Sequence, residues 1–75
     1  MNPGQKMFND FFVERALDDR KAEAQELLNE CFAKQDAGAF DRNYFAEIKP
    51  KFFAIVKPEA VDELTAAMDN FASRL

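Results

Sequence analysis

Apolar residues recur along most of this chain at the three- and four-residue intervals that gather them on one face of an α-helix. No segment alternates apolar and polar residues with a period of two, and no two-residue hairpin turn appears, so strands are not expected. The pattern predicts an all-α protein with three helices, near residues 6–34, 41–56 and 58–74. We find no internal repeat and no long linker, and therefore expect a single small helical domain over residues 1–75.

Proline and glycine mark the expected helix boundaries. A proline and a glycine close to the start predict a loose N-terminus over residues 1–5. The first helix has no internal glycine or proline, which favours one long helix, and Gly38 is suited to ending it in an inter-helix loop over residues 35–40. Pro50 lies inside the second helix, where the apolar spacing keeps its phase, so we expect a kink there rather than a split.

The third helix has the cleanest amphipathic pattern of the three. At roughly 100° per residue its apolar positions fall within one sector about 120° wide, and acidic and amide residues lie outside that sector. One buried face is therefore expected. Its members are Val61, Leu64, Thr65, Met68, Phe71, Ala72 and Leu75.

The first helix, in contrast, is apolar on two sides. Leu17, Leu28 and Cys31 share one face, whereas a cluster of phenylalanines lies on the opposite side. A continuous helix with this pattern needs two partners, so we expect a homodimer in which a second copy covers the phenylalanines. In the alternative, the helix breaks near Asp18–Lys21 and the phenylalanines rejoin the core of their own chain. Phe53, which lies off the apolar stripe of its helix, adds a further position. The interface candidates are Phe8, Phe11, Phe12 and Phe53.

Composition favours packing over catalysis. The 75 residues include nine phenylalanines but no histidine, no tryptophan and one cysteine. A chain of this size buries only about 60% of the surface that its unfolded state exposes, and a single cysteine excludes an intramolecular disulfide. Self-association is therefore the simplest further source of stability. The free thiol and the lack of an apolar signal segment at the N-terminus favour the cytoplasm.

Few side chains suggest chemistry. Four carboxylates at helical spacing form a stripe, but metal sites in helical bundles combine such carboxylates with histidines, and this stripe lies opposite the apolar face. We therefore interpret it as a solvated face, and expect no metal, no cofactor and no catalytic residue. Cys31 lies among apolar neighbours near a helix C-terminus, which is typical of a buried and unreactive thiol. The stripe consists of Asp19, Glu23, Glu26 and Glu30.

The charge distribution limits the classes of partner. The net charge is −4 and the ten basic residues are scattered, which argues against nucleic acids and anionic membranes as partners. No run approaches the roughly 18 apolar residues of a membrane-spanning helix. We therefore expect a non-enzymatic cytoplasmic interaction or regulatory module that acts by homodimerisation and by binding a protein partner. Two alternatives are an acidic inhibitor or antitoxin-like protein that covers a basic surface, and a carrier of an apolar small molecule in a phenylalanine-rich pocket.

Overall fold

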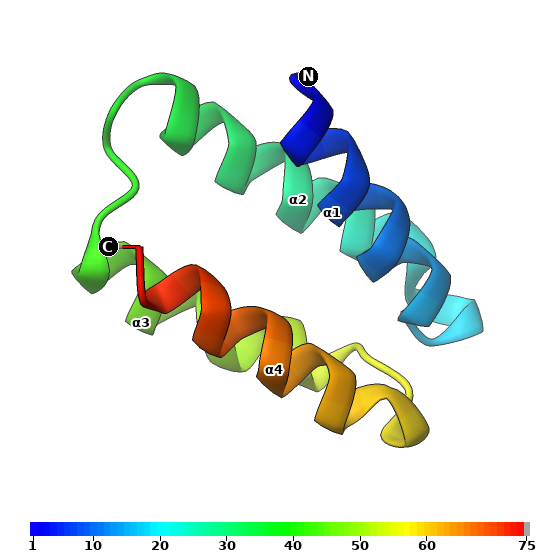
Figure 1. Cartoon of the computed structure of the whole chain (residues 1–75). Coiled ribbons are helices and arrows are strands. Elements are labelled where there is room, and N and C mark those ends of the chain that lie inside the picture. Colours follow the sequence, from blue (N-terminus) through cyan, green and yellow to red (C-terminus); the bar gives the residue numbers. More distant parts are fainter. Residues whose placement is uncertain (75) are drawn as a thin grey trace.

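The computed structural model describes residues 1–74, and within this range the chain folds into four α-helices without strands (Figure 1). The first two helices, and likewise the last two, are joined by a turn that contains a short 3₁₀ helix. The prediction of an all-α fold is confirmed. In chain order the elements are α1 (Pro3–Arg15), η1 (Asp18–Arg20), α2 (Lys21–Asp36), α3 (Arg42–Ala54), η2 (Pro58–Ala60) and α4 (Val61–Ala72).

The prediction of one long helix over residues 6–34 is wrong, because the chain leaves the helix at Ala16 and Leu17. Their ψ angles of 152° and 141° lie outside the helical region. Instead of bonding within a helix, the Leu17 amide donates to the Ile55 carbonyl at 2.9 Å, and a reciprocal bond of the same length joins the second turn to the first. Because these bonds connect segments far apart in the sequence, helical periodicity alone could not reveal the break.

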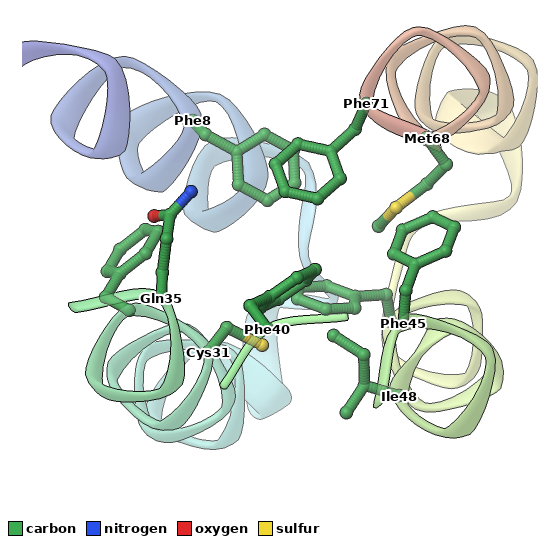
Figure 2. Close-up of a pocket in the computed structure, with 10 residues that line it drawn as sticks. Phe8, Cys31, Gln35, Phe40, Phe45, Ile48, Met68 and Phe71 are labelled. Atoms are coloured by element: carbon green, nitrogen blue, oxygen red, sulfur yellow. The ribbon is translucent and has the colours of Figure 1, made fainter. Parts of the chain in front are cut away.

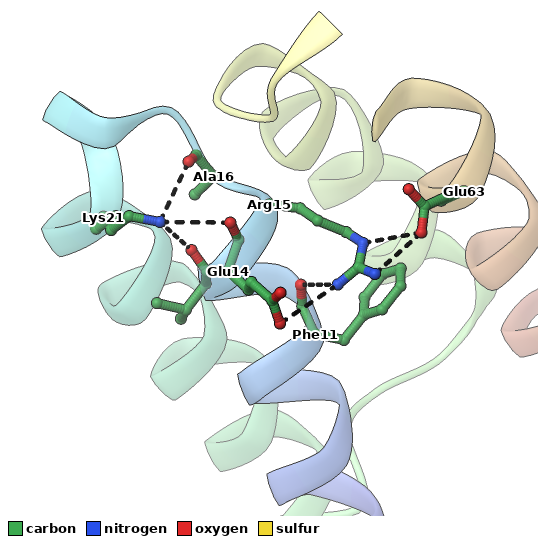
Figure 3. A network of polar contacts seen from close by, with 7 residues as sticks. Phe11, Glu14, Arg15, Ala16, Lys21 and Glu63 are labelled. Carbon is green, nitrogen blue, oxygen red and sulfur yellow. Dashed lines mark hydrogen bonds and ion pairs between the residues drawn. The ribbon is translucent and has the colours of Figure 1, made fainter. Parts of the chain in front are cut away.

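Lys21 stabilises the end of α1 where a capping glycine would otherwise be typical. Its ammonium donates to the carbonyl oxygen of Val13 at 2.6 Å and to that of Ala16 at 3.4 Å. Figure 3 shows the ammonium reaching back to the end of the preceding helix. A cation at this position also interacts favourably with the negative end of the helix dipole. The alternative of a break near Asp18–Lys21 is therefore the one that the structure adopts.

The expectation of a loose N-terminus over residues 1–5 is wrong as well. Helix α1 begins at Pro3, whose missing amide proton costs no helical hydrogen bond at that position. Asn2 and Gln5 form a capping box, in which each side-chain oxygen accepts from the backbone amide of the other residue, at 2.8 and 3.0 Å. Gln5 is buried and also donates to Gln35 at the end of α2, at 2.8 Å, which fixes the start of the chain.

The loop and the second predicted helix lie close to their expected positions. Helix α2 ends at Asp36, and Gly38 adopts a φ of 71° in the loop that follows, a conformation that glycine tolerates better than other residues. Helix α3 continues through Pro50 without splitting, as expected. Pro50 is exposed, so its ring does not disturb the core.

The third predicted helix, over residues 58–74, is η2 followed by α4, and its buried face is narrower than expected. Val61 and Thr65 are exposed, and Leu75 lies outside the described residues. The buried or partly buried members of the predicted face are Leu64, Met68, Phe71 and Ala72.

The two helical hairpins pack against each other as two layers (Figure 1). Helices α1 and α2 form one layer, and α3 and α4 form the other. The two 3₁₀ turns lie at one end, here called the turn end. The termini and the α2–α3 loop lie toward the opposite end, here called the open end. Between the layers, Phe12 and Phe52 meet edge to face with ring centroids 4.7 Å apart. The buried apolar residues are Phe12, Ala16, Ala24, Leu27, Leu28, Cys31, Phe45, Ile48, Phe52, Ile55, Val56, Ala60, Leu64 and Met68.

The two hairpins are related by approximate twofold symmetry. An antiparallel β-bridge pairs Ala16 with Val56. In its two hydrogen bonds the Leu17 amide donates to the Ile55 carbonyl, and the Lys57 amide donates to the Arg15 carbonyl. The two bonds join equivalent positions of the two hairpins. In this register, which shifts each residue by 40 positions, η1 matches η2. The sequence shows no repeat of residues, but the structure shows that the two hairpins repeat the same elements and many of the same buried positions. Matched core pairs are Phe12 and Phe52, Ala24 and Leu64, and Leu28 and Met68.

Candidate functional site

A groove of about 570 Å³ runs between α1 and α4 and reaches the open end of the molecule. We call it the α1/α4 groove. Its lining is mostly apolar, and its polar residues, Arg74 among them, gather toward the open end. The sequence analysis did not predict a site between the first and last helices, because the spacing of apolar residues does not show which helices are neighbours. The apolar lining residues are Met7, Phe8, Phe11, Phe32, Ala67 and Phe71.

Arg15 lies one helical turn beyond the groove residue Phe11 and joins α1 to α4. Its guanidinium lies 4.1 Å from the centre of the Phe11 ring and pairs with the Glu63 carboxylate of α4 at 3.0 Å. It also donates to the Phe11 carbonyl at 3.1 Å, as Figure 3 shows. Glu14 lies 3.8 Å from the same guanidinium. One arginine therefore contacts two carboxylates, whose side chains are 79% (Glu14) and 55% (Glu63) exposed.

Met7 is the most exposed large apolar residue in the described part of the chain, at 75%. It lies on α1 one helical turn before Phe11, on the side that lines the groove. Phe8 and Phe11 are partly buried against the core. This spacing was a signal available in the sequence, but a methionine in a predicted amphipathic helix is indistinguishable from a core residue until its neighbours are known.

The approximate symmetry provides an internal comparison for these residues. The positions that match Met7 and Phe11 in the other hairpin are Glu47 and Lys51 on α3. Lys51 lies beside α2 in the equivalent position between helices. Because the same fold accepts charged residues at these two positions of α3, the fold itself does not require apolar residues at the matching positions of α1. The apolar side chains of Met7 and Phe11 are therefore not required at these two positions by the fold, although Phe11 also packs against the core.

A smaller cavity of about 40 Å³ adjoins the groove (Figure 2). Phe8 and Phe71 line both spaces, and the cavity extends inward to Cys31, Ile48 and Met68. Its walls are almost entirely apolar. The volume is well below the roughly 150 Å³ of an apolar cavity known to admit benzene, so it suits a small aliphatic group rather than an aromatic ring.

The structure separates the four interface candidates. Phe12 is fully buried in the core, so it does not lie on an outer face of α1 as expected. The reason is the break after Arg15, which turns α1 so that its phenylalanines face the core of their own chain. Phe53 is partly buried against the same core. Phe8 and Phe11 alone of the four line the α1/α4 groove.

Cys31 is buried, as its neighbours in the sequence indicated. Burial raises the pKa of its thiol to about 11, although a hydrogen bond from the Tyr44 hydroxyl at 4.0 Å acts in the opposite direction. Burial and the adjacent thiol also raise the pKa of Tyr44. A neutral, enclosed thiol is a poor nucleophile.

The carboxylate stripe does not form as one row, because Asp19 belongs to η1 whereas its other members are on α2. Asp19, Glu23, Glu26 and Glu30 are all exposed. Within residues 1–74 no group of three or more acidic or cysteine side chains is arranged to hold a metal ion.

Comparisons with protein-family models, with curated proteins and with solved structures found no match for this chain. Among the helices of residues 1–74, none combines the length and the apolar character needed to cross a membrane.

Proposed function

We propose that this chain is a small helical interaction module that acts as a homodimer, in which each copy covers the α1/α4 groove of the other. The observation that carries this proposal is the groove's apolar lining at positions where the equivalent helix carries charges. Met7 and Phe11 line the groove, whereas Glu47 and Lys51 hold the matching positions of α3. An exposed apolar surface that packing does not require is typical of a protein interface.

The charges at the two ends of the groove favour a second copy as its occupant. Glu14 and Glu63 lie with Arg15 toward the turn end, and Arg74 lies at the open end, where Asp36 accepts a hydrogen bond from Gln5. A twofold axis that crosses the groove brings the turn end of one copy beside the open end of the other. Opposite charges then meet twice in the same interface, as the self-complementarity of a twofold dimer requires.

The size of this face is adequate for a dimer. A standard interface buries about 800 Å² on each partner, which is about a sixth of the 4825 Å² that this chain exposes. The molecule measures 31 × 22 × 21 Å between its outermost Cα atoms. A face that includes both α1 and α4 therefore provides an area of the required order.

The test transfers the residues of α3 to α1. The double variant Met7→Glu, Phe11→Lys places on α1 the residues that the fold already accepts at the matching positions. We expect wild-type protein to have twice its 8.6 kDa mass by light scattering at micromolar concentration. The double variant should keep its helical circular dichroism but have the monomer mass, because the apolar surface is lost.

The matched control changes the other side of the molecule. Glu47→Gln, Lys51→Gln neutralises the two charged residues of α3 at the matching positions and should leave the dimer intact. A wild-type mass of 8.6 kDa at all concentrations would contradict the homodimer. A dimer that survives Met7→Glu, Phe11→Lys would show that another surface holds it.

Other features of the proposed function follow from the same surface. An amphipathic helix of a protein partner could compete for the groove, and it would be recognised by its ability to dissociate the dimer. We propose the cytoplasm as the location, because the buried Cys31 is free and forms no disulfide.

A further inference from the structure

We infer that the Met7 side chain of each copy inserts into the cavity beneath the groove of the other copy, so that the site is complete only in the dimer. This inference rests on the proposed homodimer and names the residue that anchors it. The cavity is bounded by Phe8 and Phe71 on the groove side and by Cys31 and Ile48 farther inside. Figure 2 shows these side chains converging from all four helices.

The position of Met7 supports its role as the anchor. It lies on the face of α1 that lines the groove, and its side chain is 75% exposed, although neighbouring Phe8 is largely covered. In a twofold arrangement across the groove, the partner's α1 is the element placed against Phe8 and Phe71. An exposed methionine on that helix is then directed toward the groove that lies above the cavity.

The chemistry of methionine suits the cavity. Its side chain is unbranched and flexible, so its terminal methylthio group can enter a narrow opening. The volume of about 40 Å³ has room for such a group but not for a benzene-sized ring. The walls are rich in phenylalanine, and contacts between sulfur and aromatic rings are favourable. A residue that fills a pocket at the centre of an interface is where binding free energy is usually concentrated.

The direct test is methyl NMR of the wild-type protein labelled at its methionine methyl groups. The chain has three methionines: Met1, Met7 and Met68. As concentration rises and the dimer forms, ring currents from Phe8 and Phe71 should move the Met7 methyl signal upfield. Met1, which is 69% exposed and does not line the groove, is the internal control and should not move.

A double-mutant cycle measures the coupling between the anchor and the cavity. Met7→Ala should raise the dimer dissociation constant about tenfold or more, as loss of an anchor residue does. Cys31→Ile fills the cavity from inside, and in that background Met7→Ala should have less than about a twofold effect. Ile48→Phe fills the cavity from the opposite wall and is the cavity-filled background to use if Cys31→Ile does not fold. Ala33→Val adds the same number of side-chain atoms at an exposed position of α2 and should leave the full effect of Met7→Ala.

The outcomes separate this inference from the proposed function. If the protein is monomeric at every concentration, both are overturned. If a dimer forms through the groove but the Met7 methyl signal stays at its exposed position, the anchor is overturned and the homodimer stands. Equal effects of Met7→Ala in wild-type and cavity-filled backgrounds would also overturn the anchor.

Discussion

At the scale of single residues, the environment of Cys31 decides its chemistry. The thiol is buried among apolar side chains on α2, and its pKa is raised to about 11 because burial disfavours the charged thiolate. The nearby Tyr44 hydroxyl donates a hydrogen bond to the sulfur, but the thiol remains the favoured form. The residue therefore acts as a small apolar side chain rather than as a nucleophile.

We expect Cys31 to react with iodoacetamide much more slowly in the folded protein than in urea at the same pH.

The buried thiol also predicts a pH dependence of the free energy of unfolding. Because its pKa rises from an ordinary value of 9.0 to about 11 on folding, the unfolded state loses the proton first. The contribution of the buried thiol to the free energy of unfolding should be complete below pH 9 and should fall as the pH rises toward 11.

Urea unfolding between pH 7 and 11 measures this effect. Cys31→Ala should reduce the alkaline loss of stability, but should not abolish it, because the pKa of Tyr44 is raised as well. Fast alkylation of the folded protein at neutral pH would contradict the assignment of Cys31 as a buried, unreactive thiol.

At the scale of elements, the turns between helices were the hardest part to predict. The helical regions, the loop at Gly38 and the continuity of α3 through Pro50 follow from local signals of spacing, glycine and proline. The break at Ala16 and Leu17 has no glycine or proline signal, and the change of apolar face in the first segment indicated it only as the alternative to a dimer. It depends on a backbone pairing with Ile55 and its neighbours, and no property of the first segment alone contains that partner.

The candidate site could not be predicted from the sequence either, because it also depends on contacts between distant segments. Phe8 and Phe11 are interface candidates in the sequence because a continuous first helix would turn them away from the core. The same reasoning predicts an exposed Phe12, but Phe12 is fully buried. The groove also needs Ala67 and Phe71 from α4, and their nearness to α1 follows from the packing of two hairpins rather than from any short segment.

The contribution of the bridge between the turns can be isolated with Leu17→Pro. Proline fits the φ of −54° at this position and the extended residue before it, but it cannot donate to Ile55. Leu17→Ala is the matched control for the loss of the side chain. The lost hydrogen bond leaves a carbonyl unpaired, which costs about 1–3 kcal/mol, so we expect the proline variant to be less stable than the alanine variant.

Chemical denaturation of the two Leu17 variants gives this difference. Proline lowers the entropy of the unfolded state, which by itself would stabilise the folded protein by about 0.4–1 kcal/mol. A proline variant that is more stable than the alanine variant by this amount would mean that the bridge hydrogen bond contributes little to the fold.

At the scale of the whole molecule, two similar hairpins have different outer surfaces. The core repeats across the approximate twofold axis, so Phe12 matches Phe52 and Leu28 matches Met68. The space between α2 and α3 is lined largely by charged residues, whereas the equivalent space between α1 and α4 is mostly apolar. The difference is clearest at Met7 and Phe11, where α3 carries Glu47 and Lys51, and the proposed association would explain it.

If association supplies part of the stability of so small a chain, thermal stability should depend on protein concentration. Binding to the folded state stabilises it by mass action, by about 2.7 kcal/mol when the concentration is a hundredfold above the dissociation constant. For a domain of this size that corresponds to a rise in Tm of roughly 10–20 °C. Met7→Glu, Phe11→Lys should remove the concentration dependence. Its Tm should be no higher than that of the dilute wild-type protein, because Phe11 also packs against the core and is lost in this variant. Calorimetry across a hundredfold range of concentration makes the comparison. A wild-type Tm that is the same at both limits would show that the monomer is stable on its own and that the α1/α4 groove contributes nothing to folding.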